Sequence, residues 1–311
     1  MTVRTITLPD DARALALRQE GLLSSRQCDD LGLRRDTRSR LVADGRWARV
    51  TRGVYDVSPV SPTTPDGRRR RAAWLAMLAY GPDAAVAVGA SALALHGVRG
   101  LPATIRPEAA LPEGSARRAR DGARARCFDP VATVPVGDRR IAGLADALVR
   151  TLPELPRRNG LAVVDDVLHR RLLEPDEVAS LLGRMGRRRG VQRVRTWWPY
   201  VDGRAESPFE SFARLECIDE GLAPDELQLE IRPPDDAGVV RGDLAWRLRG
   251  GRWLVVELDG EEFHTSPDAV LADRTRQNRI ASVGWVDLLR FAWPDLGTLR
   301  IPNHVRRALT R

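Results

Sequence analysis

The chain has 311 residues, with 50 basic and 42 acidic side chains and a formal net charge of +8 at pH 7. All 50 basic residues are arginine, so chemistry that needs a lysine, such as a P-loop lysine, a Schiff base or a Ser-Lys pair, is excluded. The three cysteines, Cys28, Cys127 and Cys217, lie far apart and form no CxxC pair, which argues against disulfides or a zinc site and favours a reducing cytoplasm.

Charge is distributed unevenly along the chain. Arginines exceed acidic residues over residues 1–200, whereas residues 201–311 hold 15 arginines and 20 acidic residues. This asymmetry is typical of a polyanion-facing front part and a carboxylate-rich end, although a solvated arginine surface gives the same pattern. The N-terminus has no signal-like apolar core, and no apolar run reaches about 18 residues, so we expect a cytoplasmic protein without a membrane span.

Residues 1–58 have the pattern of a winged helix-turn-helix. Helical spacing predicts a first helix over 8–20, a second that begins at Ser24 or Ser25, and a third over 34–44. Alternating residues over 47–51 and 53–57 then predict a small hairpin, which would be the wing.

The run GLLSSRQCDDLGLRRDTRSRLVADGRWARVTRGVYDV resembles the N-terminal winged helix of the abortive-infection type IV antitoxins (AbiEi-like). The resemblance implies that the third helix reads DNA, with a cognate toxin-like or other defence protein as a further partner. Polar side chains of such a helix contact base edges and phosphates in the major groove. The candidate DNA-binding residues are Arg34, Arg35, Thr37, Arg38, Arg40 and, on the wing, Arg49. The alternatives are a winged helix used for protein contacts, or simply a small basic domain.

Residues 59–71 are rich in proline and threonine and end in four arginines, which predicts a linker. The arginine run could contact phosphates or simply begin a solvated helix. Residues 72–200 are expected to form a mainly helical middle domain, in which the S-A-x-x-L-H-G pattern at 91–97 is similar to the same antitoxin-like family. We therefore expect a structural role for His96. The expected helices cover 72–80, 86–100, 144–155, 161–173 and 175–182.

Residues 201–311 read as a helix, three strands, a helix and a strand. The helix begins at Ser207, the strands cover 226–231, 239–248 and 252–260, and a helix over 268–283 precedes a strand over 285–291.

Two carboxylates, Glu257 and Asp259, end the nearly apolar strand 252–260, where burial is costly unless a partner compensates the charge. A three-residue turn over 249–251 places Asp243 opposite Glu257, whereas a two-residue turn would place Leu244 there. Three converging carboxylates attract a hard divalent cation, and Mg²⁺ or Mn²⁺ held in this way can activate water for phosphodiester hydrolysis.

The ordered motifs GDLAW, WLVVELDGEEFH and DRTRQNRIASVGWVDLLRFAWPDL are similar to the very-short-patch-repair-like (Vsr-like) branch of the PD-(D/E)xK nucleases. The resemblance implies a restriction-endonuclease-like α/β domain with a mixed sheet and with Asp243 and Glu257 as metal ligands. Asp259 stands where the superfamily often has a lysine, which this chain lacks.

Further site residues follow from the same resemblance. Glu210 would be an active-site acid, or the N3 residue of a capping box that begins at Ser207. His264 would act as a proton shuttle or phosphate ligand, or order its loop through a hydrogen bond. Gln228, Arg274 and Gln277 are candidates for contacts with water or phosphate.

The sequence thus predicts an α/β multi-domain protein. Its parts are a winged helix-turn-helix (1–58), a linker (59–71), a helical middle domain (72–200) and a nuclease-like domain (201–311). The predicted function is Mg²⁺-dependent DNA cleavage in phage defence or a toxin–antitoxin-like system. Two alternatives stay open: a DNA-binding regulator whose nuclease fold is structural or dimerising, and an antitoxin that binds a partner protein.

Overall fold

The computed structural model describes most of the chain as two compact units. The described residues are 8–58, 62–81, 85–111, 122–127, 132–233, 238–260, 279–280 and 282–311. The first unit comprises residues 1–155 and 176–194, and the second comprises 156–175 and 195–311. Over the described ranges, no helix has the length and apolar character that crossing a bilayer requires.

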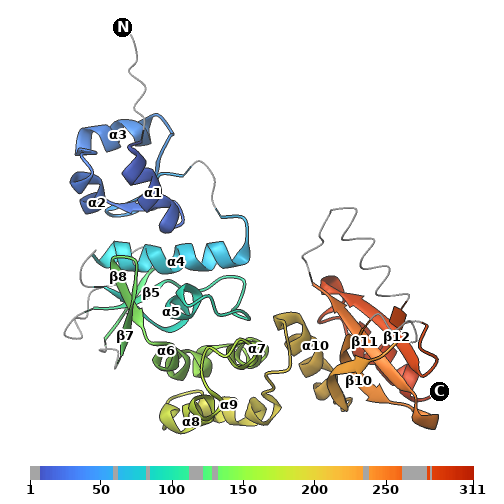
Figure 1. The fold of residues 1–311 in the computed structure, drawn as a ribbon. Coiled ribbons are helices and arrows are strands. Elements are labelled where there is room, and N and C mark those ends of the chain that lie inside the picture. The colour runs from blue at the N-terminus through green and yellow to red at the C-terminus, as the bar shows by residue number, and fades with distance from the viewer. Residues whose placement is uncertain are drawn as a thin grey trace. The chain divides into compact units, whose positions relative to one another are not determined.

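A winged helix begins the first unit, as predicted (Figure 1). Its sheet has the strand order β1-β3-β2, and Ser24 and Gln27 form a capping box at the start of the second helix. Ala12, Leu23, Leu41 and Trp47 pack in its core. The elements are α1 (Asp10–Arg18), β1 (Leu22–Ser24), α2 (Ser25–Asp30), α3 (Arg35–Ala43), β2 (Ala48–Thr51) and β3 (Val54–Asp56).

The arginine run at residues 68–71 belongs to a helix and not to a linker. Helix α4 (Pro65–Tyr80) begins at proline, and Thr64 accepts a hydrogen bond from Gly67 N as its cap. Within the first unit, α4 lies between the winged helix and a five-stranded sheet (Figure 1).

These arginines contact protein groups. Arg70 Nε donates to Glu20 Oε1 and Arg71 to Asp56 Oδ2, each at 2.6 Å, and Arg69 donates to the backbone oxygen of Leu101 at 2.7 Å. The run therefore lies near the start of a helix, as one of the two expected uses had it, but Arg70 and Arg71 contact acidic residues of the winged helix and not solvent alone.

The middle of the chain is less helical than expected. Five short strands form a mixed sheet of order β6-β5-β4-β8-β7. Because each strand has only two to four residues, the sequence offers no alternation long enough to predict them. The strands are β4 (Val86–Ala87), β5 (Glu108–Ala110), β6 (Arg124–Arg126), β7 (Thr133–Val136) and β8 (Arg139–Ala142).

Helices α4 and α5 pack against this sheet, and further helices follow along the chain. His96, at the end of α5, has its ring Nε2 2.9 Å from the backbone oxygen of Ala142, which agrees with the structural role expected for it. The helices are α5 (Gly89–Leu95), α6 (Leu144–Thr151), α8 (Pro175–Met185) and α9 (Val191–Trp197), with 3-10 turns η2 (Leu152–Glu154) and η3 (Trp198–Tyr200).

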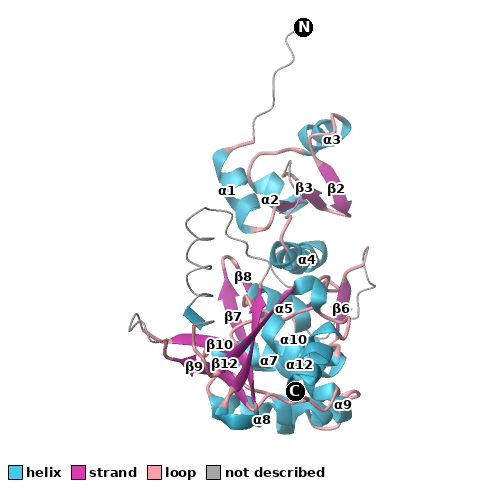
Figure 2. Cartoon of the chain, turned by 90° about the vertical axis from the view of Figure 1, so that its right-hand side faces the viewer, coloured by secondary structure: helices cyan, strands magenta, loops and turns pink. Residues whose placement is uncertain are grey.

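The second unit is built around a four-stranded sheet of order β12-β11-β10-β9 (Figures 1 and 2). β11 and β12 are parallel, whereas the other pairs are antiparallel. Phe209, Leu244 and Ile301 belong to one apolar cluster, and Ala245 and Val255 belong to another. The elements are α7 (Arg157–His169), α10 (Pro208–Asp219), β9 (Glu226–Ile231), β10 (Val240–Arg247), η4 (Arg249–Gly251), β11 (Trp253–Asp259), β12 (Val286–Ala292), η5 (Trp293–Asp295) and α12 (Arg300–Leu309).

The predicted strands of this unit are found within a residue or two of their expected bounds. Helix α12 was not predicted. Most of the helix expected over 268–283 lies outside the described residues.

Candidate nucleic-acid interface and polar row

Exposed arginines line helix α3 of the winged helix. Arg34 precedes the first turn, and Arg35 and Arg40 follow on the helix; all three are exposed, while Leu41 is buried in the domain core. Arg49 is exposed on β2, and Thr37 is half-buried. These residues belong to the set predicted for DNA contact, and the exposure of the four arginines is what contacts with phosphates and base edges require.

Arg38 is the exception in the predicted set, because it is a structural residue. Its side chain is only 6% exposed and forms an ion pair with Asp29. The same guanidinium donates to the backbone oxygens of Leu33 at 2.8 Å and Ser25 at 3.2 Å, and lies over the ring of Tyr55. Arg38 therefore ties α3 to α2 and the wing and is corrected from a DNA contact to a scaffold residue.

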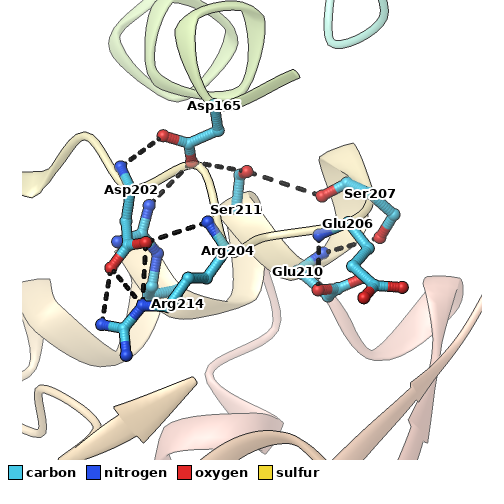
Figure 3. A network of polar contacts seen from close by, with 8 residues as sticks. All are labelled: Asp165, Asp202, Arg204, Glu206, Ser207, Glu210, Ser211 and Arg214. Carbon is cyan, nitrogen blue, oxygen red and sulfur yellow. Dashed lines mark hydrogen bonds and ion pairs between the residues drawn. The ribbon is translucent and has the colours of Figure 1, made fainter. Parts of the chain in front are cut away.

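A buried charge network joins α7 to α10 in the second unit (Figure 3). Asp165 accepts hydrogen bonds from Arg214 and Ser211 at 2.7 Å and from the backbone N–H of Asp202 at 2.8 Å. Burial raises the pKa of Asp165 to about 6, although the Arg214 charge and the hydrogen bonds lower it. Sequence analysis missed this network, although two adjacent aspartates in the apolar run LAVVDDVL were a signal of a buried charge.

Glu210 has a partner on the sheet as well as a capping role. Ser207 accepts a hydrogen bond from Glu210 N at 3.2 Å, so the predicted N-cap is present (Figure 3). The Glu210 carboxylate accepts from Glu206 N and from Gln228 Nε2, both at 2.9 Å. Burial raises the pKa of Glu210, while these hydrogen bonds oppose the rise.

Gln228 reaches Glu210 from an irregular point of β9. Its φ of 53° lies in the left-handed region, which a non-glycine residue seldom adopts. The side chain links the edge strand to α10, so the candidate water contact is occupied by a protein carboxylate.

The predicted three-residue turn is found, together with the register of the four residue pairs next to it. Leu244 pairs with Val256 and Arg247 with Trp253, so the register continued by one residue brings Asp243 opposite Glu257. The turn is the expected three-residue one, with Gly250 at φ 72°, a conformation that favours glycine.

β10 and β11 also lie close together at Gly242, the residue before Asp243. A Cβ atom on Gly242 would lie 2.3 Å from Val255 Cγ1, so only glycine fits there. Asp243 Oδ2 accepts a hydrogen bond from Leu258 N at 2.7 Å. One oxygen of this carboxylate is thus held by the backbone of the neighbouring strand.

Arg290 lies directly beside Glu257, because β12 runs parallel to β11 and pairs these two residues. Continued through its adjacent pairs, the β9–β10 register brings Gln228 beside Asp243. Gln228, Asp243, Glu257 and Arg290 therefore follow one another across four strands, and we call them the polar row. Sequence analysis assigned no role to Arg290, although it lies in the motif GWVDLLRF that carried the nuclease resemblance.

Arg290 compensates both acidic residues at the end of β11. Its Nε donates to Asp259 Oδ2 at 3.1 Å, a second nitrogen lies 2.5 Å from Asp259 Oδ1, and Nε is 3.7 Å from Glu257 Oε2. The Glu257 side chain is 3% exposed, so its charge needs a nearby partner.

The predicted metal ligand Glu257 lies beside a protein cation, Arg290. No group of three or more His, Cys, Asp or Glu side chains in the described ranges is placed to hold a metal ion. Asp259, predicted to position water beside the metal pair Asp243 and Glu257, instead binds Arg290 through both oxygens, and the metal pair itself stays a prediction. A divalent ion on Glu257 would also be repelled by the Arg290 guanidinium. The remaining candidates, His264, Arg274 and Gln277, lie outside the described residues.

The N-terminal part of the chain is similar to a known family. A family described as "Transcriptional regulator, AbiEi antitoxin" matches residues 10–56. Two uncharacterized proteins of Mycobacterium tuberculosis, from strains CDC 1551 / Oshkosh and ATCC 25618 / H37Rv, are each 33% identical to the chain over 180 residues. That similarity covers 56% of this chain and 64% of each relative, less than two thirds of their length. The winged helix at residues 10–56 is therefore similar to that of AbiEi-type transcriptional regulators, as its sequence predicted.

Proposed function

We propose that the protein is a DNA-binding transcriptional regulator of the antitoxin type. The observation that carries the proposal is the exposed arginine surface of α3, where Arg34, Arg35 and Arg40 extend from a helix that Arg38 fixes on its domain. The match of residues 10–56 to an antitoxin regulator family supports it. Arginines on such a helix donate to phosphate oxygens and in pairs of hydrogen bonds to guanine edges.

Selection of duplexes from a random library, followed by fluorescence anisotropy, tests the proposal. We expect one preferred duplex that binds about a thousandfold or more tighter than unrelated DNA. Its affinity should fall steeply with salt, because arginine–phosphate contacts release counterions. Equal affinity for all sequences, or binding that salt leaves unchanged, would contradict a regulator that reads DNA.

The biological setting we propose is a toxin–antitoxin-like system of phage defence, in which the regulator has a cognate toxin-like partner. The match of residues 10–56 to an antitoxin family supports the toxin-like partner. Co-purification of the tagged chain with the product of a neighbouring gene, and rescue of cells that express that product, test it. Absence of both effects for every adjacent gene would contradict it.

Metal-dependent phosphodiester hydrolysis is the rival function. The register that brings Asp243 opposite Glu257 favours it, whereas the contacts of Arg290 with Glu257 and Asp259 oppose it. Incubation of plasmid and single-stranded DNA with the full chain and Mg²⁺ or Mn²⁺ tests it. Cleavage that is lost in an Asp243→Ala, Glu257→Ala variant would favour the nuclease.

A further inference from the structure

The polar row contains a cation that the protein itself supplies. Arg290 is positioned by the backbone, because the parallel pairing of β11 and β12 fixes its Cα beside that of Glu257. Its side chain is only 19% exposed. A guanidinium stays protonated at any physiological pH, so this positive charge is permanent.

Arg290 contacts two acidic side chains, Asp259 and Glu257. Two of its nitrogens contact the two oxygens of Asp259, the paired geometry that guanidinium and carboxylate groups prefer. Glu257, almost fully buried, has the same guanidinium 3.7 Å away. On the other side of Glu257, Asp243 is held by Leu258 N. A metal ion bound to Glu257 would lie close to the Arg290 guanidinium and would be repelled by its charge.

We propose that Arg290 is the resident counter-cation of the polar row and that it keeps divalent metal ions out. The row then serves to join β10, β11 and β12 through charge and hydrogen bonds, and it supports no metal-dependent reaction. This role concerns the second unit and does not depend on DNA binding by α3, so either proposal can fail while the other stands.

Calorimetric titration of the metal-free full chain with Mn²⁺ tests the inference. The unmodified protein should give no saturable heat up to about 1 mM Mn²⁺, a range that covers weak oxygen-ligand sites. Arg290→Gln removes the positive charge, and we expect Mn²⁺ affinity to rise at least about tenfold. Adding Glu257→Gln to that variant should abolish the gain, because Glu257 would be the principal ligand.

Two control variants distinguish the loss of the positive charge at Arg290 from a general disturbance of the fold. Arg290→Lys keeps a positive charge and should remain unable to bind Mn²⁺. Arg252→Gln removes an ion pair with Asp287 that joins the beginning of the same two strands. It should leave the titration unchanged, because it does not touch the polar row.

Saturable Mn²⁺ binding by the unmodified protein that Glu257→Gln abolishes would overturn the inference. So would a folded Arg290→Gln variant, with a cooperative melt and unchanged near-ultraviolet circular dichroism, that binds no Mn²⁺. If Arg290→Gln does not fold, the Arg290→Lys variant decides in its place: Mn²⁺ binding by it refutes the inference, and its absence supports it. DNA anisotropy measured on the same samples reports separately on the proposed regulator.

Discussion

The winged helix and the second unit use the same residue type, arginine, in opposite ways. On α3, Arg34, Arg35 and Arg40 are exposed to solvent. In the second unit, Arg214 and Arg290 are mostly buried and contact aspartate or glutamate. The difference lies in burial and in the acidic neighbours, and it separates arginines that can bind another molecule from arginines that hold the fold together.

The largest expected effect is on the buried pair Arg214–Asp165, whose side chains are 5% and 1% exposed. Arg214→Ala leaves Asp165 buried without its cation, so we expect the free energy of unfolding to fall by about 3–5 kcal/mol. Urea unfolding followed by tryptophan fluorescence measures it, because six of the eight tryptophans lie in the second unit.

The matched control is Arg204→Ala, which removes ion pairs with Asp202 and Glu226 from a side chain that is 54% exposed. Screening by solvent should limit its cost to less than about 1 kcal/mol. Equal losses for the two variants would show that burial does not distinguish these arginines.

The second-largest expected effect is on the stability of the winged helix, where a buried and an exposed arginine of α3 are compared. Arg38→Met keeps the apolar stem but removes the contacts with Asp29 and with the backbone oxygens of Leu33 and Ser25. We expect it to destabilise the winged helix by about 2 kcal/mol. Arg40→Met, at an exposed position, should change stability by less than about 0.5 kcal/mol. Hydrogen–deuterium exchange of the α3 amides measures both, and faster exchange in Arg40→Met than in Arg38→Met would refute the scaffold role.

The smallest effect is the pH dependence that Asp165 gives to the second unit. Its pKa of about 6 in the folded chain lies above the ordinary value of 3.8, so the folded state binds the proton more tightly. Its stabilising contribution is complete below about pH 4 and is lost as pH rises through 6. Between pH 5 and pH 7, the free energy of unfolding should fall by about 1 kcal/mol.

Asp165→Asn is the control for this dependence, and urea titrations at the two pH values measure it. The variant should have a flatter profile over this interval. Burial also raises the pKa of Glu210, which acts in the same direction, so Glu210→Gln is measured beside it. An unchanged slope in Asp165→Asn would assign the dependence to other groups.

The sequence predicted those elements whose position is marked by residues close to them in the chain. The capping residues and helical spacing identified the winged helix, and the length of the turn over 249–251 predicted the hairpin register in which Leu244 pairs with Val256. The strands of the middle sheet are too short for a recognisable alternation.

Long-range partners could not be predicted in this way. Asp165 and Arg214 are 49 residues apart, and Arg290 reaches Glu257 only because two parallel strands pair across a crossover. The charge of a carboxylate is visible in the sequence, but the cation that compensates it depends on tertiary structure. This is why Glu257 suggested a metal site and Arg290 was missed.

The most direct test is a DNA affinity measurement on Arg34→Ala, Arg35→Ala, Arg40→Ala in one chain. The comparison variant removes three arginines that are equally exposed but lie in the second unit, Arg232, Arg249 and Arg307. The account predicts that the α3 variant loses at least about a hundredfold in affinity for the selected duplex, while the comparison variant stays within about threefold of the unmodified protein. Equal losses in the two variants would contradict the claim that α3 reads DNA.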